Sequence, residues 1–152
     1  MDIASLILRA AFSGLFLNAA YQCARFFDLT AADTSLLVGE RWKRPAAAVG
    51  IGMMLLGGLS VLFNYKIRLG AGLLAVFLIG GTIIHRRQEL LSATLREQLR
   101  SATESTAWPT VDALAGLAMG GHFTSWLKNL VLLGVALYFV LNGFQGICSL
   151  FE

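Results

Sequence analysis

Residues 46–84 read AAAVGIGMMLLGGLSVLFNYKIRLGAGLLAVFLIGGTII and decide the fold. Two apolar runs, 46–63 and 69–84, lie on either side of the short polar stretch NYKIR. Neither run contains a charged residue, and each is about as long as a helix needs to cross a hydrocarbon core of roughly 30 Å. In lipid a helix satisfies its own backbone hydrogen bonds, which an open strand cannot do. The stretch therefore predicts a transmembrane helical hairpin, with Lys66 and Arg68 at one water interface.

The composition of the 152-residue chain is also that of a membrane protein. Hydrophobic residues make up 57% of the chain and charged residues only 14%, which is far from ordinary soluble usage. The length gives room for one domain, which we take as residues 1–152. The formal net charge of +3 is too small and too scattered to predict nucleic-acid binding.

An amphipathic segment is predicted before the last membrane span. Leucines recur at positions 91, 95 and 99, with charged residues elsewhere on the helical wheel. Such a helix either extends the preceding span into water or lies on the membrane surface. Trp108 and Pro109 are expected to end it, and residues 110–119 to form a short separate helix stopped by Gly120 and Gly121. The predicted fold class is an all-α integral membrane four-helix bundle with an amphipathic helical insertion, its helices covering about residues 3–24, 46–63, 69–85 and 128–148 and the insertion about residues 86–106.

The distribution of basic residues predicts the orientation. Four crossings place both termini on one side together with Lys66 and Arg68. The positive-inside rule then makes the long connections cytoplasmic and both termini non-cytoplasmic. Cys23 and Cys148 fall on opposite faces, so no disulfide between them is expected, because a disulfide needs Cα atoms within about 7 Å. Nine basic residues lie on the side predicted to be cytoplasmic: Arg25, Arg41, Lys43, Arg44, Arg86, Arg87, Arg96, Arg100 and Lys128.

Several short pieces of the chain resemble the DoxX family of small four-helix membrane proteins. Residues 9–27 read RAAFSGLFLNAAYQCARFF, like the family's Arg-led, Gly-containing first helix, and LLGGLSVLF resembles its second helix. The third predicted helix ends in His85, as in many members, and LKNLVLLGVAL opens the fourth. Where the family often has a His-Gly pair and a Lys late in the first helix, this chain has Ala19-Ala20 and Cys23. The resemblance implies a small integral membrane protein associated with quinone-linked redox systems, such as the membrane part of thiosulfate:quinone oxidoreductase.

Four residues are candidates for binding a quinone or another polar ligand: Arg9, His85, Tyr138 and Asn142. Arg9 is expected about two turns inside the membrane edge, where an uncompensated guanidinium would cost several kcal/mol. It could hold a quinone oxygen, or it could snorkel to the interface or pair with polar groups. Asn142 and Gln145 are expected at a similar depth, and Tyr138 a turn deeper. An unperturbed histidine pKa near 6.5 suits His85 to proton exchange with a quinol, although a histidine before two arginines also fits an interfacial position.

Motifs of conventional catalysis are missing from the sequence. His85 and His122 have no acid or thiol at a metal-ligand spacing, and no phosphate loop or nucleophile elbow appears. No carboxylate lies within a predicted span, which argues against a carboxylate-based proton pump. We therefore predict no catalytic residue, no metal and no intrinsic cofactor, with quinone as the one cofactor that the resemblance introduces.

Three functions fit these features. The first is an accessory or structural subunit of a larger membrane complex, respiratory or photosynthetic, whose partners are the bilayer and other membrane protein subunits. The second is a quinone-interacting subunit of a redox system, and the third is a membrane assembly factor. The sequence favours the first, because apolar helices with few catalytic groups and a docking segment suit a subunit. Such a chain would not be an enzyme on its own; as part of one it would be a quinone-linked oxidoreductase subunit.

Overall fold

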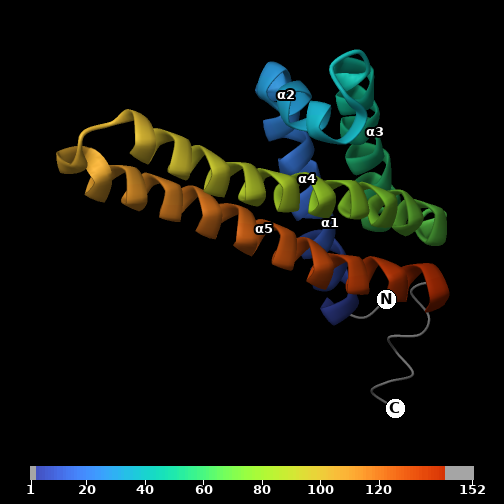
Figure 1. Ribbon diagram of the computed structural model, residues 1–152. Helices are drawn as coiled ribbons and strands as arrows, with labels where there is room; N and C mark the ends of the chain where they lie inside the picture. The colour runs from blue at the N-terminus through green and yellow to red at the C-terminus, as the bar shows by residue number, and fades with distance from the viewer. Residues whose placement is uncertain (1–2, 143–152) are drawn as a thin grey trace.

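The computed structural model describes residues 3–142, which form helices joined by short turns (Figure 1). The all-α class is thus confirmed. Three segments are long and apolar enough to cross a membrane, Lys43–Leu62, Ile67–Ala102 and Ser105–Asn142. The described residues hold five α-helices where four were predicted: α1 (Ile3–Arg25), α2 (Phe27–Val38), α3 (Lys43–Leu62), α4 (Ile67–Ala102) and α5 (Trp108–Asn142), with a short 3-10 helix, η1 (Ser105–Ala107).

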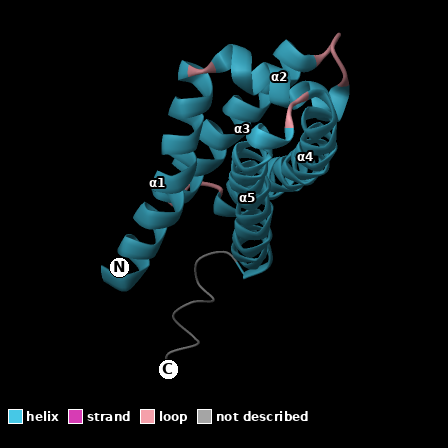
Figure 2. Ribbon diagram, turned by 60° about the vertical axis from the view of Figure 1, so that its left-hand side comes forward, coloured by secondary structure: helices cyan, strands magenta, loops and turns pink. Residues whose placement is uncertain are grey.

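The additional helix is α2, which lies in what the sequence suggested was a connection. It follows α1 after a single residue, Phe26, and the Thr30 hydroxyl donates a hydrogen bond to the Cys23 carbonyl oxygen across this break, at 3.1 Å. The helix ends at Gly39, whose φ of +79° is a conformation that glycine adopts without strain. Figure 2 shows α2 at one end of the bundle, close to α3 and α4.

The predicted hairpin around residues 64–68 is present as α3, a tight turn and α4. Asn64 and Lys66 adopt positive φ values of 55° and 48° in this turn, which reverses the chain within four residues. Pro45 lies in the first turn of α3, where a missing N–H leaves no hydrogen bond unmade. The two helices approach closely at glycines, since a Cβ on Gly57 would lie only 2.8 Å from the Gly70 carbonyl oxygen.

The segment predicted as an amphipathic insertion, about residues 86–106, is not a separate element: its residues up to Ala102 form the second half of α4. The predicted short helix at 110–119 and the last span beginning at 128 are likewise one helix, α5, which starts at Trp108. Gly120 and Gly121 do not interrupt it, because α5 packs along α4 over both halves. The predicted end of this helix at residue 148, and Cys148 itself, lie outside the described residues.

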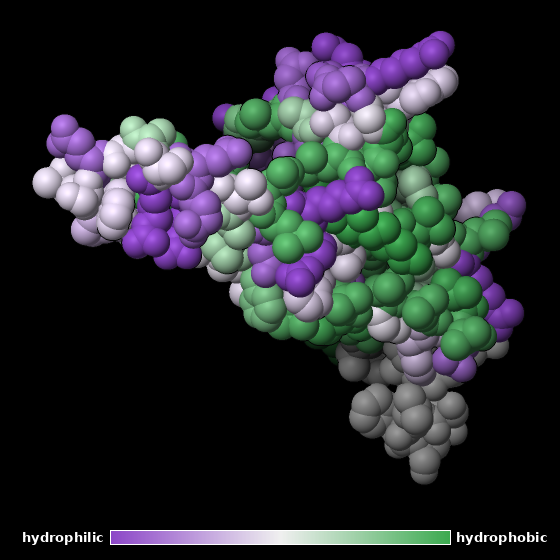
Figure 3. All heavy atoms as spheres, viewed as in Figure 1, coloured by the Kyte–Doolittle hydropathy of each residue, from purple (hydrophilic) through white to green (hydrophobic). Residues whose placement is uncertain are grey.

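The tip of the α4–α5 hairpin projects beyond the other helices (Figure 1) and is covered largely by polar residues (Figure 3). Arg96 Nε lies 2.9 Å from Asp112 Oδ1, and Arg100 Nη2 lies 3.3 Å from Oδ2 of the same carboxylate. The Trp108 indole N–H also donates to the Arg100 carbonyl oxygen at 3.1 Å. These contacts fix the two helices side by side outside the apolar run 67–84.

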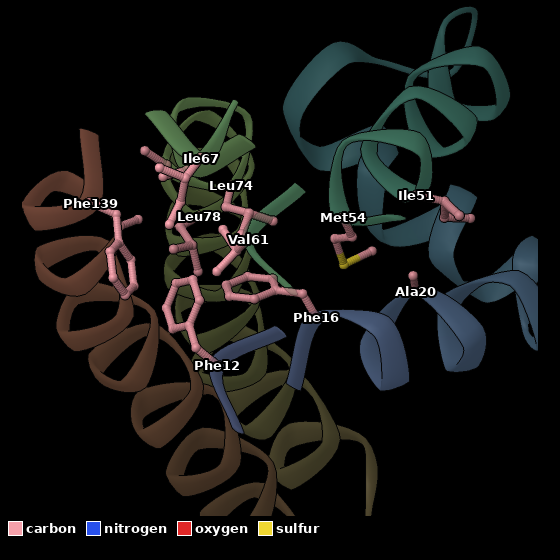
Figure 4. Packing of buried hydrophobic residues seen from close by; sticks show 13 residues of the cluster. Phe12, Phe16, Ala20, Ile51, Met54, Val61, Ile67, Leu74, Leu78 and Phe139 are labelled. Atoms are coloured by element: carbon pink, nitrogen blue, oxygen red, sulfur yellow. The ribbon is translucent and has the colours of Figure 1, made fainter. Parts of the chain in front are cut away.

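The core joins α1 to α3, α4 and α5 through aromatic and aliphatic side chains (Figure 4). Phe12 and Phe16 on α1 stack edge to face with ring centroids 5.1 Å apart, and Phe12 meets Phe139 of α5 at 5.4 Å. Leu74 and Leu78 of α4 are buried in the same cluster. The residues of α1 in this core, Phe12, Phe16 and Ala20, are four positions apart. They therefore form one apolar stripe, by which α1 packs on the other helices although it also contains polar residues.

Candidate lipophilic-ligand site

A cavity of about 770 Å³ lies between α2, α3 and α4. Its volume is in the range of small-molecule pockets, which are concave and mostly apolar with a few polar groups. The wall is formed by the first half of α3, by the end of the apolar run of α4, and by one side of α2. Apolar side chains dominate this wall, among them Leu37, Met53, Met54, Val76, Phe77 and Ile84.

Two glycines lie in the cavity wall, where side chains of neighbouring helices approach the backbone closely. A Cβ on Gly80 would lie 3.4 Å from Cδ2 of Leu37, and one on Gly50 would lie 3.7 Å from the Phe77 ring. Both glycines line the cavity. A Cβ at either position would therefore contact another residue that lines the cavity, Leu37 or Phe77.

One end of the cavity is polar and is lined by Thr30, Asp33, Thr34 and His85. Here a chain of hydrogen bonds links two helices. Gln88 Nε2 donates to Asp33 Oδ1 at 2.6 Å, and Gln88 Oε1 lies 3.1 Å from His85 Nδ1. The His122 ring of α5 lies near His85, with 5.8 Å between centroids. The apolar cavity thus ends in a polar cluster to which α2, α4 and α5 all contribute.

His85 follows the apolar run of α4 directly, at the edge of the predicted span, and its side chain is partly buried. Gln88 engages its Nδ1, and the His122 ring of α5 lies beside its ring.

Helix α2 is held over the cavity by Arg87. The Arg87 guanidinium donates a hydrogen bond to the Leu36 carbonyl oxygen in the last turn of α2. The carbonyls of a last turn have no partner within their own helix, and a cation is favourable at this end of the helix dipole. The contact complements the Gln88–Asp33 hydrogen bond, which lies about one turn earlier on α2.

Arg87→Ala is expected to loosen α2 without unfolding the bundle. Because a hydrogen bond from a charged group contributes roughly 1.5–3 kcal/mol, amide hydrogen exchange in α2 should rise about tenfold or more. Exchange measured by mass spectrometry over residues 27–39 gives the readout. Arg86→Ala is the matched control, because Arg86 pairs within its own helix with Glu89 at 2.6 Å. Equal exchange in the two variants would show that Arg87 does not anchor α2.

The four predicted site residues fall at two separate places. His85 lines the cavity, as does Cys23 of α1, whereas Arg9 lies fourteen residues before Cys23, about 21 Å along the helix. Arg9 is only 2% exposed, so it faces the interior of the bundle. Near it, Phe12 meets Phe139, the neighbour of Tyr138, and the exposed Asn142 side chain donates to the Tyr138 carbonyl oxygen at 3.2 Å. A shared ligand site of Arg9, Tyr138 and Asn142 stays a prediction.

Sequence reasoning missed the partners of His85. Gln88 follows it by one helical turn, a spacing that places both side chains on one helix face and was available as a signal. Asp33 was assigned to a connection, and its place beside Gln88 depends on the docking of α2. In the described part of the chain, residues 3–142, no three His, Cys, Asp or Glu side chains gather as a metal site.

No family model matches the chain, and neither a curated protein nor a solved structure matches it. The resemblance to the DoxX family therefore rests on the short pieces of sequence in the first helix, the Gly-Gly run, His85 and the KNL stretch.

Proposed function

We propose that this chain is an integral membrane protein that binds a lipophilic molecule of the quinone class between α2, α3 and α4. The observation that carries this proposal is the cavity of about 770 Å³, with apolar walls and a histidine-containing polar end. An isoprenoid or alkyl tail would lie along Val76 and Phe77, and the ring would lie toward His85. The sequence favoured an accessory or structural subunit of a larger membrane complex; the cavity makes ligand binding the better-supported function.

The position of the cavity relative to the membrane supports the same proposal. Arg41, Lys43, Arg86 and Arg87 all lie close in sequence to residues that line it, whereas Lys66 and Arg68 lie at the other end of α3 and α4. By the positive-inside rule the polar end of the cavity faces the cytoplasm, and the start of α1 lies on the non-cytoplasmic side. A ligand would enter from the bilayer with its head group at the cytoplasmic interface.

Filling part of the cavity is expected to weaken binding. Ala46 is half-buried and lines the cavity, so Ala46→Phe places a ring where the ligand would lie. Overpacking of this kind costs about 1–3 kcal/mol, and the same cost on ligand binding would lower affinity by about 5- to 150-fold. The measurement is binding of a benzoquinone with a decyl tail, in oxidised and reduced forms, to detergent-purified protein.

Ala48→Phe is the matched control, because Ala48 is exposed on the same helix and does not line the cavity. The control should bind as the wild type does. Unchanged affinity in Ala46→Phe, or an equal loss in both variants, would remove the cavity from the binding function.

A second function is favoured by a separate observation: the part of the α4–α5 hairpin beyond the apolar run 67–84 exposes several leucines. Apolar patches outside lipid mark protein contact sites. We propose that this surface docks on another subunit, so that the chain belongs to a larger membrane complex while it binds its ligand. The leucines are half to three-quarters exposed and comprise Leu90, Leu91, Leu95, Leu99, Leu114 and Leu117.

Native-size analysis of gently extracted protein, with mass spectrometry of the copurifying chains, tests the second function. A subunit comigrates with its partners at fixed stoichiometry, and Leu95→Lys should release it. An assembly factor would appear only with incomplete assemblies. Migration as a single small particle would contradict both forms of association and would leave ligand binding as the function.

A further inference from the structure

We infer that the cavity selects a head group that donates a hydroxyl hydrogen, such as a quinol, a phenol or an alcohol, over one that only accepts hydrogen bonds. The inference rests on the proposed ligand-binding function and names the chemistry that the polar end recognises. It follows from the hydrogen-bond chain Asp33–Gln88–His85 and from the state of the two threonines beside it.

Asp33 fixes the orientation of the Gln88 side-chain amide. A carboxylate offers only acceptors, so the group that Gln88 presents to Asp33 Oδ1 at 2.6 Å must be its amide nitrogen. Oxygen and nitrogen of an amide exchange places when the group flips, and Asp33 decides between the two orientations. The Gln88 oxygen consequently faces His85.

Gln88 in turn fixes the tautomer of His85. Nδ1 lies 3.1 Å from Gln88 Oε1, which can only accept, so Nδ1 carries the proton. A neutral imidazole has a single N–H, and the remaining nitrogen, Nε2, is therefore an acceptor. A second-shell partner commonly fixes a histidine tautomer in this way. Since His85 lines the cavity, Nε2 is the ring nitrogen left to bind a ligand.

The neighbouring hydroxyls of Thr30 and Thr34 both donate their hydrogens to backbone carbonyl oxygens. Thr34 Oγ1 donates to the Thr30 carbonyl oxygen at 2.7 Å, and Thr30 Oγ1 donates to the Cys23 carbonyl oxygen at 3.1 Å. Both hydroxyl hydrogens are thus used within the protein, and the lone pairs of both oxygens remain as acceptors. With the Asp33 carboxylate, the polar end offers mostly acceptors; the strong side-chain donor on the wall is the indole N–H of Trp42, in the turn before α3.

Three probes with the same decyl tail test this inference: a hydroquinone, its dimethyl ether and the oxidised benzoquinone. The wild type should bind the hydroquinone at least about tenfold more tightly than the dimethyl ether, because one hydrogen bond to a buried acceptor contributes about 1 kcal/mol and an unmet acceptor adds a penalty. Asp33→Asn retains a hydrogen-bonding group but lets Gln88 take either orientation, so the preference should shrink to a few-fold while binding persists.

Asp28→Asn is the matched control, since Asp28 is an exposed carboxylate of α2 that faces Arg44 at 3.4 Å. It should keep the full preference. Equal affinity for the three probes, or tighter binding of the oxidised form, would overturn the inference and leave the proposed function standing. Binding of none of the probes would overturn both.

The tautomer itself provides a test that needs no ligand. Ring ¹⁵N chemical shifts of labelled wild-type protein at pH 7 should show His85 protonated at Nδ1 and unprotonated at Nε2, with His122→Gln used for assignment. The opposite tautomer would overturn the inference.

Discussion

Gly70→Val is expected to separate α3 from α4 and to lower the free energy of unfolding by about 3 kcal/mol. A Cβ on Gly70 would overlap the Ser60 side chain and lie 3.1 Å from the Gly57 carbonyl oxygen. Because one of these neighbours is backbone, the clash cannot be relieved by a rotamer change. Small residues drive helix association in membranes by allowing such close approach, so the loss affects the predicted hairpin directly. Thermal unfolding in detergent, followed by circular dichroism, measures the effect.

Gly72→Val is the control for this substitution. Gly72 lies in the same helix, and a Cβ there meets no other atom within 4 Å. The change in helix propensity is the same in both variants, so their difference reports the contact alone. Equal stability of Gly70→Val and Gly72→Val would contradict the packing described for α3 and α4.

Phe139→Ala is expected to lower the free energy of unfolding by about 3 kcal/mol and to release α5 from α1. The Phe139 side chain is 0% exposed and packs against Phe12 with ring centroids 5.4 Å apart. In lipid most of this effect comes from lost packing and the resulting void rather than from transfer to water. The melting temperature in detergent and disulfide trapping between introduced cysteines on α1 and α5 provide the readouts.

Leu141→Ala serves as the comparison, because Leu141 is 74% exposed on the same helix. It should change stability by less than about 0.5 kcal/mol. Similar losses in the two variants would mean that Phe139 does not join α5 to the core.

The sequence predicted those helices and turns that are determined by residues close together in the chain. The first helix, predicted over 3–24, is α1 (Ile3–Arg25), and the polar stretch at 64–68 contains most of the turn between α3 and α4, which is residues 63–66. Charge-free apolar runs and a positive-φ turn containing Asn64 are local features. They depend on neighbours in sequence, which is why they were visible without a structure.

Helix α2 could not be predicted in this way. At twelve residues it is too short to be stable on propensity alone, so its stability depends on docking. The hydrogen bonds that hold it, from Arg87 to Leu36 and from Gln88 to Asp33, join residues 51 and 55 positions apart. The continuity of α5 through Gly120 and Gly121 has the same cause, because packing on α4 outweighs their low helix propensity.

The candidate site was predicted only in part for the same reason. His85 was identified from its position at the end of an apolar run, but the cavity beside it needs α2, α3 and α4 together. Arg9 was expected about two turns inside the membrane edge, where it would hold a ligand, snorkel or pair with polar groups. The structure buries it among core residues, which does not fit snorkelling. Its role and that of Tyr138 remain predictions.

Photo-crosslinking can show directly whether a lipophilic ligand lies between α2, α3 and α4. A decyl-tailed hydroquinone carrying a diazirine on the tail is irradiated with the purified protein, and the modified peptides are mapped by mass spectrometry. We expect adducts at cavity residues such as Met53, Val76 and Phe77, and we expect these adducts to disappear in Ala46→Phe. Adducts confined to outward-facing residues such as Leu56 and Leu137, unchanged in Ala46→Phe, would contradict it.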